Sequence, residues 1–128
     1  MSWTRWITFW RVLAVLAIAL IWIGSLWPAN ELRQFDVSWF NDKVGHLLGY
    51  LTVALLLALG WRQSPPWLLW LIATLSGALA ELAQGYLSTT RSMEWLDLAA
   101  NGGGALIGII LGVGWCRLVT PSEAGAEN

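Results

Sequence analysis

Charge is scarce in this chain of 128 residues, because Asp, Glu, Lys and Arg together make up only 12% of the sequence. Soluble domains carry about 25% charged residues, so the composition argues against a soluble fold. Hydrophobic residues reach 57%. A transmembrane helix needs roughly 20 mostly apolar residues, and four such helices use most of the chain. We therefore expect one membrane domain over residues 1–120, followed by a disordered acidic tail over 121–128.

Cysteine, basic clusters and metal motifs are also scarce or absent. The single cysteine, Cys116, rules out an internal disulfide, and it lies at the end of an apolar run, where we expect it to pack as a small apolar residue. Lys and Arg number 7 against 8 Asp and Glu, with no run of one sign, so no nucleic-acid partner is expected. No H-E-x-x-H or comparably dense motif is present, and the sequence predicts no metal and no other cofactor.

Four apolar runs predict transmembrane helices, over about residues 9–27, 41–61, 67–87 and 95–118. Prolines at positions 28, 65 and 66 block helix continuation after the first and second runs. A cleaved signal peptide is the rival interpretation of the first run, but no A-x-A-like cleavage site precedes Glu31, and three more spans follow. The predicted fold class is therefore all-α, a four-helix transmembrane bundle.

Eleven tryptophans help to place the membrane boundaries, because indole rings favour the interface between lipid and water. Five of them mark the edges of the apolar runs: Trp27, Trp61, Trp67, Trp95 and Trp115. Three more precede the first run and are expected in the headgroup region: Trp3, Trp6 and Trp10.

The distribution of Lys and Arg sets the orientation in the membrane. With a cytoplasmic N-terminus, four cations lie inside and three outside: Arg5, Arg11, Arg62 and Arg117 against Arg33, Lys43 and Arg91. Both termini are therefore predicted to be cytoplasmic.

Polar residues within the spans converge on one membrane face, because the second and fourth helices begin where the third ends. At 1.5 Å per residue, Glu81 and Asn101 each lie about 9 Å below that face, and His46 and Tyr50 bracket this depth. The set comprises Asp42, Lys43, His46, Tyr50, Glu81, Gln84, Arg91, Asp97 and Asn101. Ionisable groups inside a membrane are expensive and are functional candidates by default. The sequence therefore predicts a polar pocket at this face.

Within this pocket, His46, Glu81 and Asp97 are the candidate catalytic residues. The candidate ligand-binding residues are Asp42, Lys43, Tyr50, Gln84, Arg91 and Asn101. Structural roles compete with these assignments. The two aspartates begin helices, where acids stabilise the helix dipole, and the two cations could only neutralise the acids. For Tyr50 and Gln84, packing or a supporting role is favoured over direct binding, while His46 is equally consistent with a neutral, hydrogen-bonded imidazole.

Small residues line one face of the fourth helix, where Gly104, Gly108 and Gly112 recur every fourth position. Such a face admits another helix at close range. Packing against a helix of the same chain is favoured over homodimerisation, and the oligomeric state stays open.

The ordered polar motifs resemble the VanZ-like family of small bacterial membrane proteins. The matching segments are N-D-K-V-G-H-L-L-G-Y from Asn41, E-L-A-Q from Glu81, Arg91-Ser92, and D-L-A-A-N-G-G-G-A from Asp97. The resemblance covers about residues 41–112, and this chain is richer in glycine after Asn101 than the family pattern. It implies a bacterial cytoplasmic membrane and envelope biology, with a link to susceptibility to teicoplanin-type glycopeptides. It does not supply a reaction.

Four functions compete. The first is binding or modification of an envelope lipid, or of a lipid-linked anionic precursor, at the outer face of the membrane. The second is an enzyme that uses Asp42, His46, Glu81 and Asp97 for metal or acid–base chemistry. The third is a proton-coupled carrier in which Glu81 titrates, and the fourth is a scaffold that binds a membrane partner without catalysis. Whether any reaction is catalysed stays open.

Overall fold

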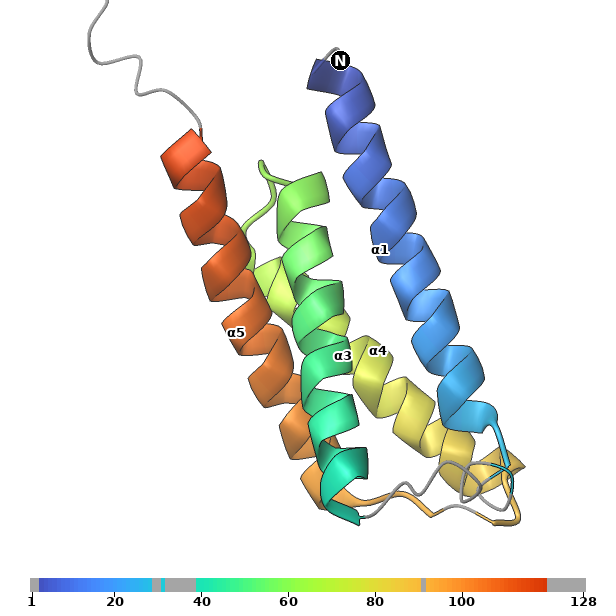
Figure 1. Ribbon diagram of the computed structural model, residues 1–128. Helices are drawn as coiled ribbons and strands as arrows, with labels where there is room; N and C mark the ends of the chain where they lie inside the picture. Colours follow the sequence, from blue (N-terminus) through green and yellow to red (C-terminus); the bar gives the residue numbers. More distant parts are fainter. Residues whose placement is uncertain (1–2, 29–30, 32–38, 91, 120–128) are drawn as a thin grey trace, which may run out of the picture.

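The computed structural model describes residues 3–28, 31, 39–90 and 92–119, and its regular structure there is entirely helical (Figure 1). The helices are α1 (Trp3–Leu26), α3 (Trp39–Gly60), α4 (Pro66–Leu87) and α5 (Trp95–Val119). All four are long and apolar enough to cross a membrane. The predicted all-α bundle of four transmembrane helices is therefore confirmed. The tail over 121–128 lies outside the described residues.

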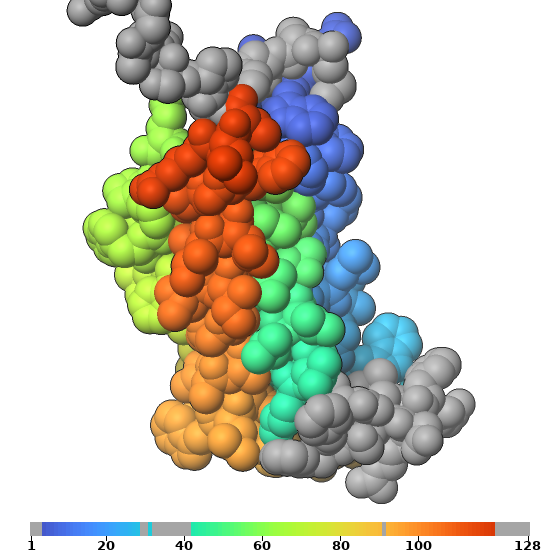
Figure 2. All heavy atoms as spheres, turned by 60° about the vertical axis from the view of Figure 1, so that its left-hand side comes forward, coloured from blue at the N-terminus to red at the C-terminus, as the bar shows by residue number. Residues whose placement is uncertain are grey.

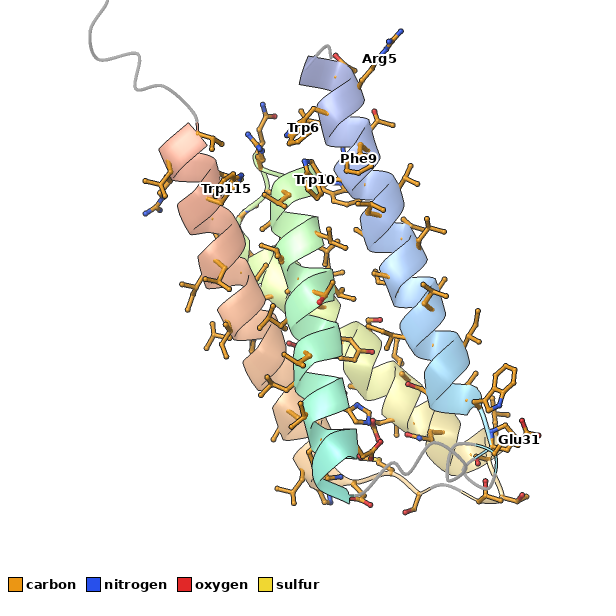
Figure 3. The ribbon with its side chains drawn as sticks, in the orientation of Figure 1. Arg5, Trp6, Phe9, Trp10, Glu31 and Trp115 are labelled. Atoms are coloured by element: carbon orange, nitrogen blue, oxygen red, sulfur yellow. The ribbon has the colours of Figure 1, made fainter. Side chains whose placement is uncertain are left out.

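The boundaries of α3, α4 and α5 fall within two residues of those predicted, but the predicted start of the first helix near residue 9 is wrong. α1 begins at Trp3, because no proline or glycine interrupts the residues before Phe9. The Thr8 hydroxyl donates to the Thr4 carbonyl at 3.0 Å, and the rings of Trp6, Phe9 and Trp10 pack on one another at the top of α1 (Figure 3). These aromatic residues are thus helical.

The centre of the bundle is α3, which contacts the other three helices and packs most extensively on α5. Apart from Tyr50, its buried residues are small or branched, with Val53 and Ala54 fully buried and Ala58 nearly so. α5 lies alongside α3 over most of its length (Figure 2). In contrast, α1 is the least buried span, and among the described residues it contacts α3 and α4 but not α5.

The glycine face of α5 is directed at α3. A Cβ atom on Gly104 would collide with the carbonyl oxygen of Leu47, and one on Gly108 with that of Leu51. At Gly112, a Cβ would lie 2.5 Å from the Cβ of Ala58. The close approach of the two backbones therefore depends on these glycines, and the face is used within the chain.

The bundle has two chemically different ends. We call the end where α3 and α5 begin and α4 finishes the cluster end, at the bottom of Figure 1. The opposite end, which holds the start of α1 and the end of α5, is the arginine end. α3 and α5 run in the same direction, so the first turns of both helices meet at the cluster end.

Candidate functional site

Polar side chains from three helices meet inside the cluster end. We call Asp42, Lys43, His46, Glu81, Glu94, Asp97 and Asn101 the polar cluster. Three of its members are almost inaccessible, with Glu81 and Asn101 each 1% exposed and Asp97 3% exposed. Buried polar groups are costly unless they are paired, and the contacts within the cluster show how the pairing is made.

Lys43 joins α3 to the start of α5. Its Nζ donates to a carboxylate oxygen of Glu94 at 2.5 Å and to Oδ1 of Asp97. The Asp97 side chain is 4% exposed, whereas that of Glu94 is 45% exposed. Lys43 therefore neutralises a deeply buried acid and a superficial one at the same time. This geometry corresponds to the charge-neutralising alternative for Lys43 that the sequence left open.

His46 on α3 lies close to polar side chains of both α4 and α5. Its Nδ1 lies 3.0 Å from Oδ1 of Asn101 and 3.5 Å from Oε1 of Glu81, and its Nε2 lies 3.7 Å from Oδ2 of Asp97. A carboxamide oxygen only accepts hydrogen bonds, so this contact requires the tautomer in which Nδ1 is protonated and donates a hydrogen bond to Asn101. The predicted proximity of His46, Glu81 and Asn101 is thus confirmed; their chemical roles stay a prediction.

Gly77 on α4 makes room for the side chain of Asn101, and the sequence patterns did not identify this glycine. A Cβ on Gly77 would lie 2.9 Å from Nδ2 of Asn101, where the carboxamide now packs. Nearby, Nε1 of Trp70 donates to the carbonyl oxygen of Gly102 at 3.1 Å. These contacts hold Asn101 in place between α4 and α5. The signal was present in the sequence, because Gly77, Glu81 and Gln84 follow one helical stripe.

Glu94 is a second residue that the sequence patterns do not identify, because it lies between two predicted helices, just before α5 begins. Its spacing of three residues from Asp97 places both on one side of the chain as the helix begins. That spacing could have identified Glu94 as a second partner for a cation.

The remaining predicted residues take different positions. Asp42 lies in the first turn of α3, where an acid also favours the helix dipole, and it approaches His46 and Asp97. Tyr50 is 2% exposed and packs beside Ser76 and Glu81.

Gln84 is 1% exposed, and its side-chain oxygen has no hydrogen-bond partner among the described residues. Arg91 lies outside the described residues.

No family model, curated protein or solved structure matches this chain. The functional argument therefore depends on the geometry and chemistry of the polar cluster.

The polar cluster combines four carboxylates, one ammonium group and one imidazole. Carboxylates can orient the hydroxyl or amine groups of a ligand, and a histidine held between two acids can move a proton between them. The apolar surroundings strengthen each of these interactions, because the local dielectric is low.

Proposed function

We propose that this chain is a VanZ-like, multi-pass protein of the bacterial cytoplasmic membrane that binds the headgroup of an envelope lipid or lipid-linked precursor. In this proposal the cluster end opens as a polar pocket at the outer face, and both termini are cytoplasmic. One observation carries the proposal: the chain buries Glu81, Asp97 and Asn101 almost completely in an otherwise apolar bundle. Isolated ion pairs add little stability when buried, so a binding role explains them better than a structural role does.

The composition of the polar cluster suggests which parts of a headgroup it would contact. Asp42 and Asp97 would accept hydrogen bonds from hydroxyl or amine groups, with His46 and Glu81 deeper in the bundle to orient them or relay a proton. An anionic phosphate would approach Lys43 from the surface. It would replace Glu94, whose side chain is 45% exposed, and leave the bond to Asp97 in place. Arg91 would contribute the second cation.

Lipid binding by the purified full-length protein tests the proposal. Native mass spectrometry would count retained phosphatidylethanolamine, phosphatidylglycerol and undecaprenyl phosphate. We expect the Lys43→Gln, Arg91→Gln double variant, compared with the wild type at equal helix content by circular dichroism, to lose at least tenfold in retention of the anionic lipids, because a charge-assisted hydrogen bond contributes about 1.5–3 kcal/mol. Glu31→Gln is the matched control, since Glu31 lies at the same end but accepts from Nε1 of Trp27 outside the polar cluster. A folded double variant that retains lipid like the wild type would rule out the headgroup site.

The alternative is a scaffold without catalysis. The engagement of Lys43 by two acids favours it, because this cation already has a structural function. Glu81→Ala separates the two proposals in a strain whose susceptibility to teicoplanin depends on the protein. A phenotype that survives the substitution, with normal accumulation of the variant, favours the scaffold.

A further inference from the structure

We infer that Asp42, His46 and Asp97 form a binding site for a divalent transition-metal ion at the cluster end. One ligand atom from each residue lies within 4.8 Å of the other two. An ion with tetrahedral bonds of about 2.1 Å holds its ligand atoms about 3.4 Å apart. The three groups therefore need to close by at most about 1.4 Å, which side-chain rotation can supply, and Asp42 and His46 lie one turn apart on the same helix.

The orientation of the imidazole is the second observation that indicates a cation. With Nδ1 donating to Oδ1 of Asn101, Nε2 carries a lone pair in the neutral form of the ring. Nε2 lies 3.7 Å from Oδ2 of Asp97, too far for a hydrogen bond. In this form, two electron-pair donors lie across a gap that a bound cation would bridge.

Asn101 has the properties of the residue that orients a metal-binding histidine. Such histidines usually donate their other ring N–H to an oxygen, which fixes the tautomer and the ring orientation. Asn101 is 1% exposed, and Gly77 on α4 leaves room for its side chain. The ring is therefore preorganised before any ion arrives, which reduces the entropic cost of binding.

Lys43 does not exclude the ion, because it occupies only Oδ1 of Asp97 and leaves Oδ2 free to act as a ligand. The charge of the whole membrane face favours a cation as well. Its loops and helix ends carry six acids against three bases, counted over the complete sequence: Glu31, Asp36, Asp42, Glu81, Glu94 and Asp97 against Arg33, Lys43 and Arg91. This imbalance includes both arginines that lie outside the described residues.

The ligand chemistry indicates the class of ion. One imidazole and two carboxylates suit borderline divalent ions such as Zn²⁺, Mn²⁺ and Co²⁺, whereas Ca²⁺ and Mg²⁺ favour sites made of oxygen alone. The open coordination positions would then accept an oxygen of a phosphate, which explains how an acidic cluster could receive an anionic headgroup. Only this last step rests on the proposed function.

Metal binding can be measured without any anionic lipid. The full-length protein, treated with a chelator and placed in phosphatidylcholine nanodiscs, would be titrated with Co²⁺ and followed by visible absorption, with Zn²⁺ as the competitor. We expect one Co²⁺ per chain and its displacement by Zn²⁺. Asp42→Asn and His46→Gln should each weaken binding at least tenfold, since even the loss of an outer-shell partner typically costs 10–100-fold.

Glu94→Gln is the matched control, because it removes a carboxylate from the same cluster without removing a ligand. We expect its affinity to stay within about threefold of the wild type, since the effect of a neighbouring charge is screened near the surface. The helix content of each metal-free variant, measured by circular dichroism, identifies any variant that fails to fold. Equal losses in Glu94→Gln and in both ligand variants would show diffuse attraction and overturn the inference, as would the absence of stoichiometric binding in the wild type. Lipid retention in the presence of chelator would then still test the proposed function separately.

Discussion

The two ends of the bundle place their charged groups differently. At the cluster end, the ammonium group of Lys43 meets carboxylates in the interior, and it holds Asp97. At the arginine end, Nε of Arg11 donates to the carbonyl oxygen of Gly60 at 2.9 Å, and its guanidinium group lies over the ring of Trp61. One end thus buries its charges in pairs, while the other keeps its cations at the rim against backbone and aromatic groups.

Exposed aromatic residues lie at both ends, with Trp27 and Trp95 at the cluster end. Trp6, Phe9, Trp10 and Trp115 lie at the arginine end together with Arg5, as Figure 3 shows. Tryptophan and arginine at a rim anchor a helix bundle in the interface at little energetic cost, because the charged group still reaches water. Buried acids offer no such anchoring. Both ends therefore carry residues that suit the interface, and the buried carboxylates distinguish the cluster end as the place where any ligand chemistry would occur.

The largest effect is expected where a cation is removed from the interior. Lys43→Gln leaves the Asp97 carboxylate without its ammonium partner, and breaking a buried pair costs about 3–5 kcal/mol. The added substitution Asp97→Asn should restore most of this loss, since it removes the unpaired charge. Denaturant unfolding in detergent micelles would measure both. The control is Arg117→Gln at the exposed end of α5, for which we expect a change within about 0.5 kcal/mol. Equal stability of Lys43→Gln and Arg117→Gln would abolish the distinction between the two ends.

Glycine-to-alanine substitutions along α5 compare the stability contributed by helix packing near the two ends. Gly104→Ala and Gly108→Ala should destabilise the fold by about 1–3 kcal/mol, because the added methyl group meets a backbone carbonyl that cannot rotate away. Gly112→Ala, nearer the arginine end, should cost less, because its closest contact is the Ala58 side chain.

Gly103→Ala is the control for this series, since no atom of another described helix lies within 4 Å of its Cβ position. It should be neutral or stabilising by up to about 1 kcal/mol, the helix propensity gained from glycine to alanine. A uniform response of all four positions in thermal unfolding would contradict the backbone contact.

The smallest effect is expected at the arginine end. Arg11→Gln removes the contact with the Trp61 ring, where the guanidinium carbon lies 5.1 Å from the ring centroid. An exposed cation–π pair contributes about 0.5–1 kcal/mol, and Arg11→Lys should retain part of it. A double-mutant cycle with Trp61→Leu isolates the pair from other changes. A coupling energy as large as that between Lys43 and Asp97 would contradict the proposed division.

Much of this architecture follows from the sequence because it depends on local patterns. Four apolar runs predict four spans, and their alternating direction alone brings His46, Glu81 and Asn101 to one face. The pairing of Lys43 with Glu94 could not be predicted, because it depends on how a loop residue meets a different helix. The start of α1 was misplaced for another reason: tryptophans that favour the interface can also be helical, so composition did not reveal the boundary.

The glycine contacts also set the axial alignment of α5 on α3. Because the two helices run in the same direction, the contact of Gly104 with Leu47 is repeated one turn later by the contact of Gly108 with Leu51. A slip by one turn would move α5 by about 5.4 Å, enough to separate His46 from Asn101. The glycines thus fix the axial position of α5 relative to α3. A methyl group added to one of them, in the apolar part of the bundle, would therefore displace Asn101 from His46 in the polar cluster.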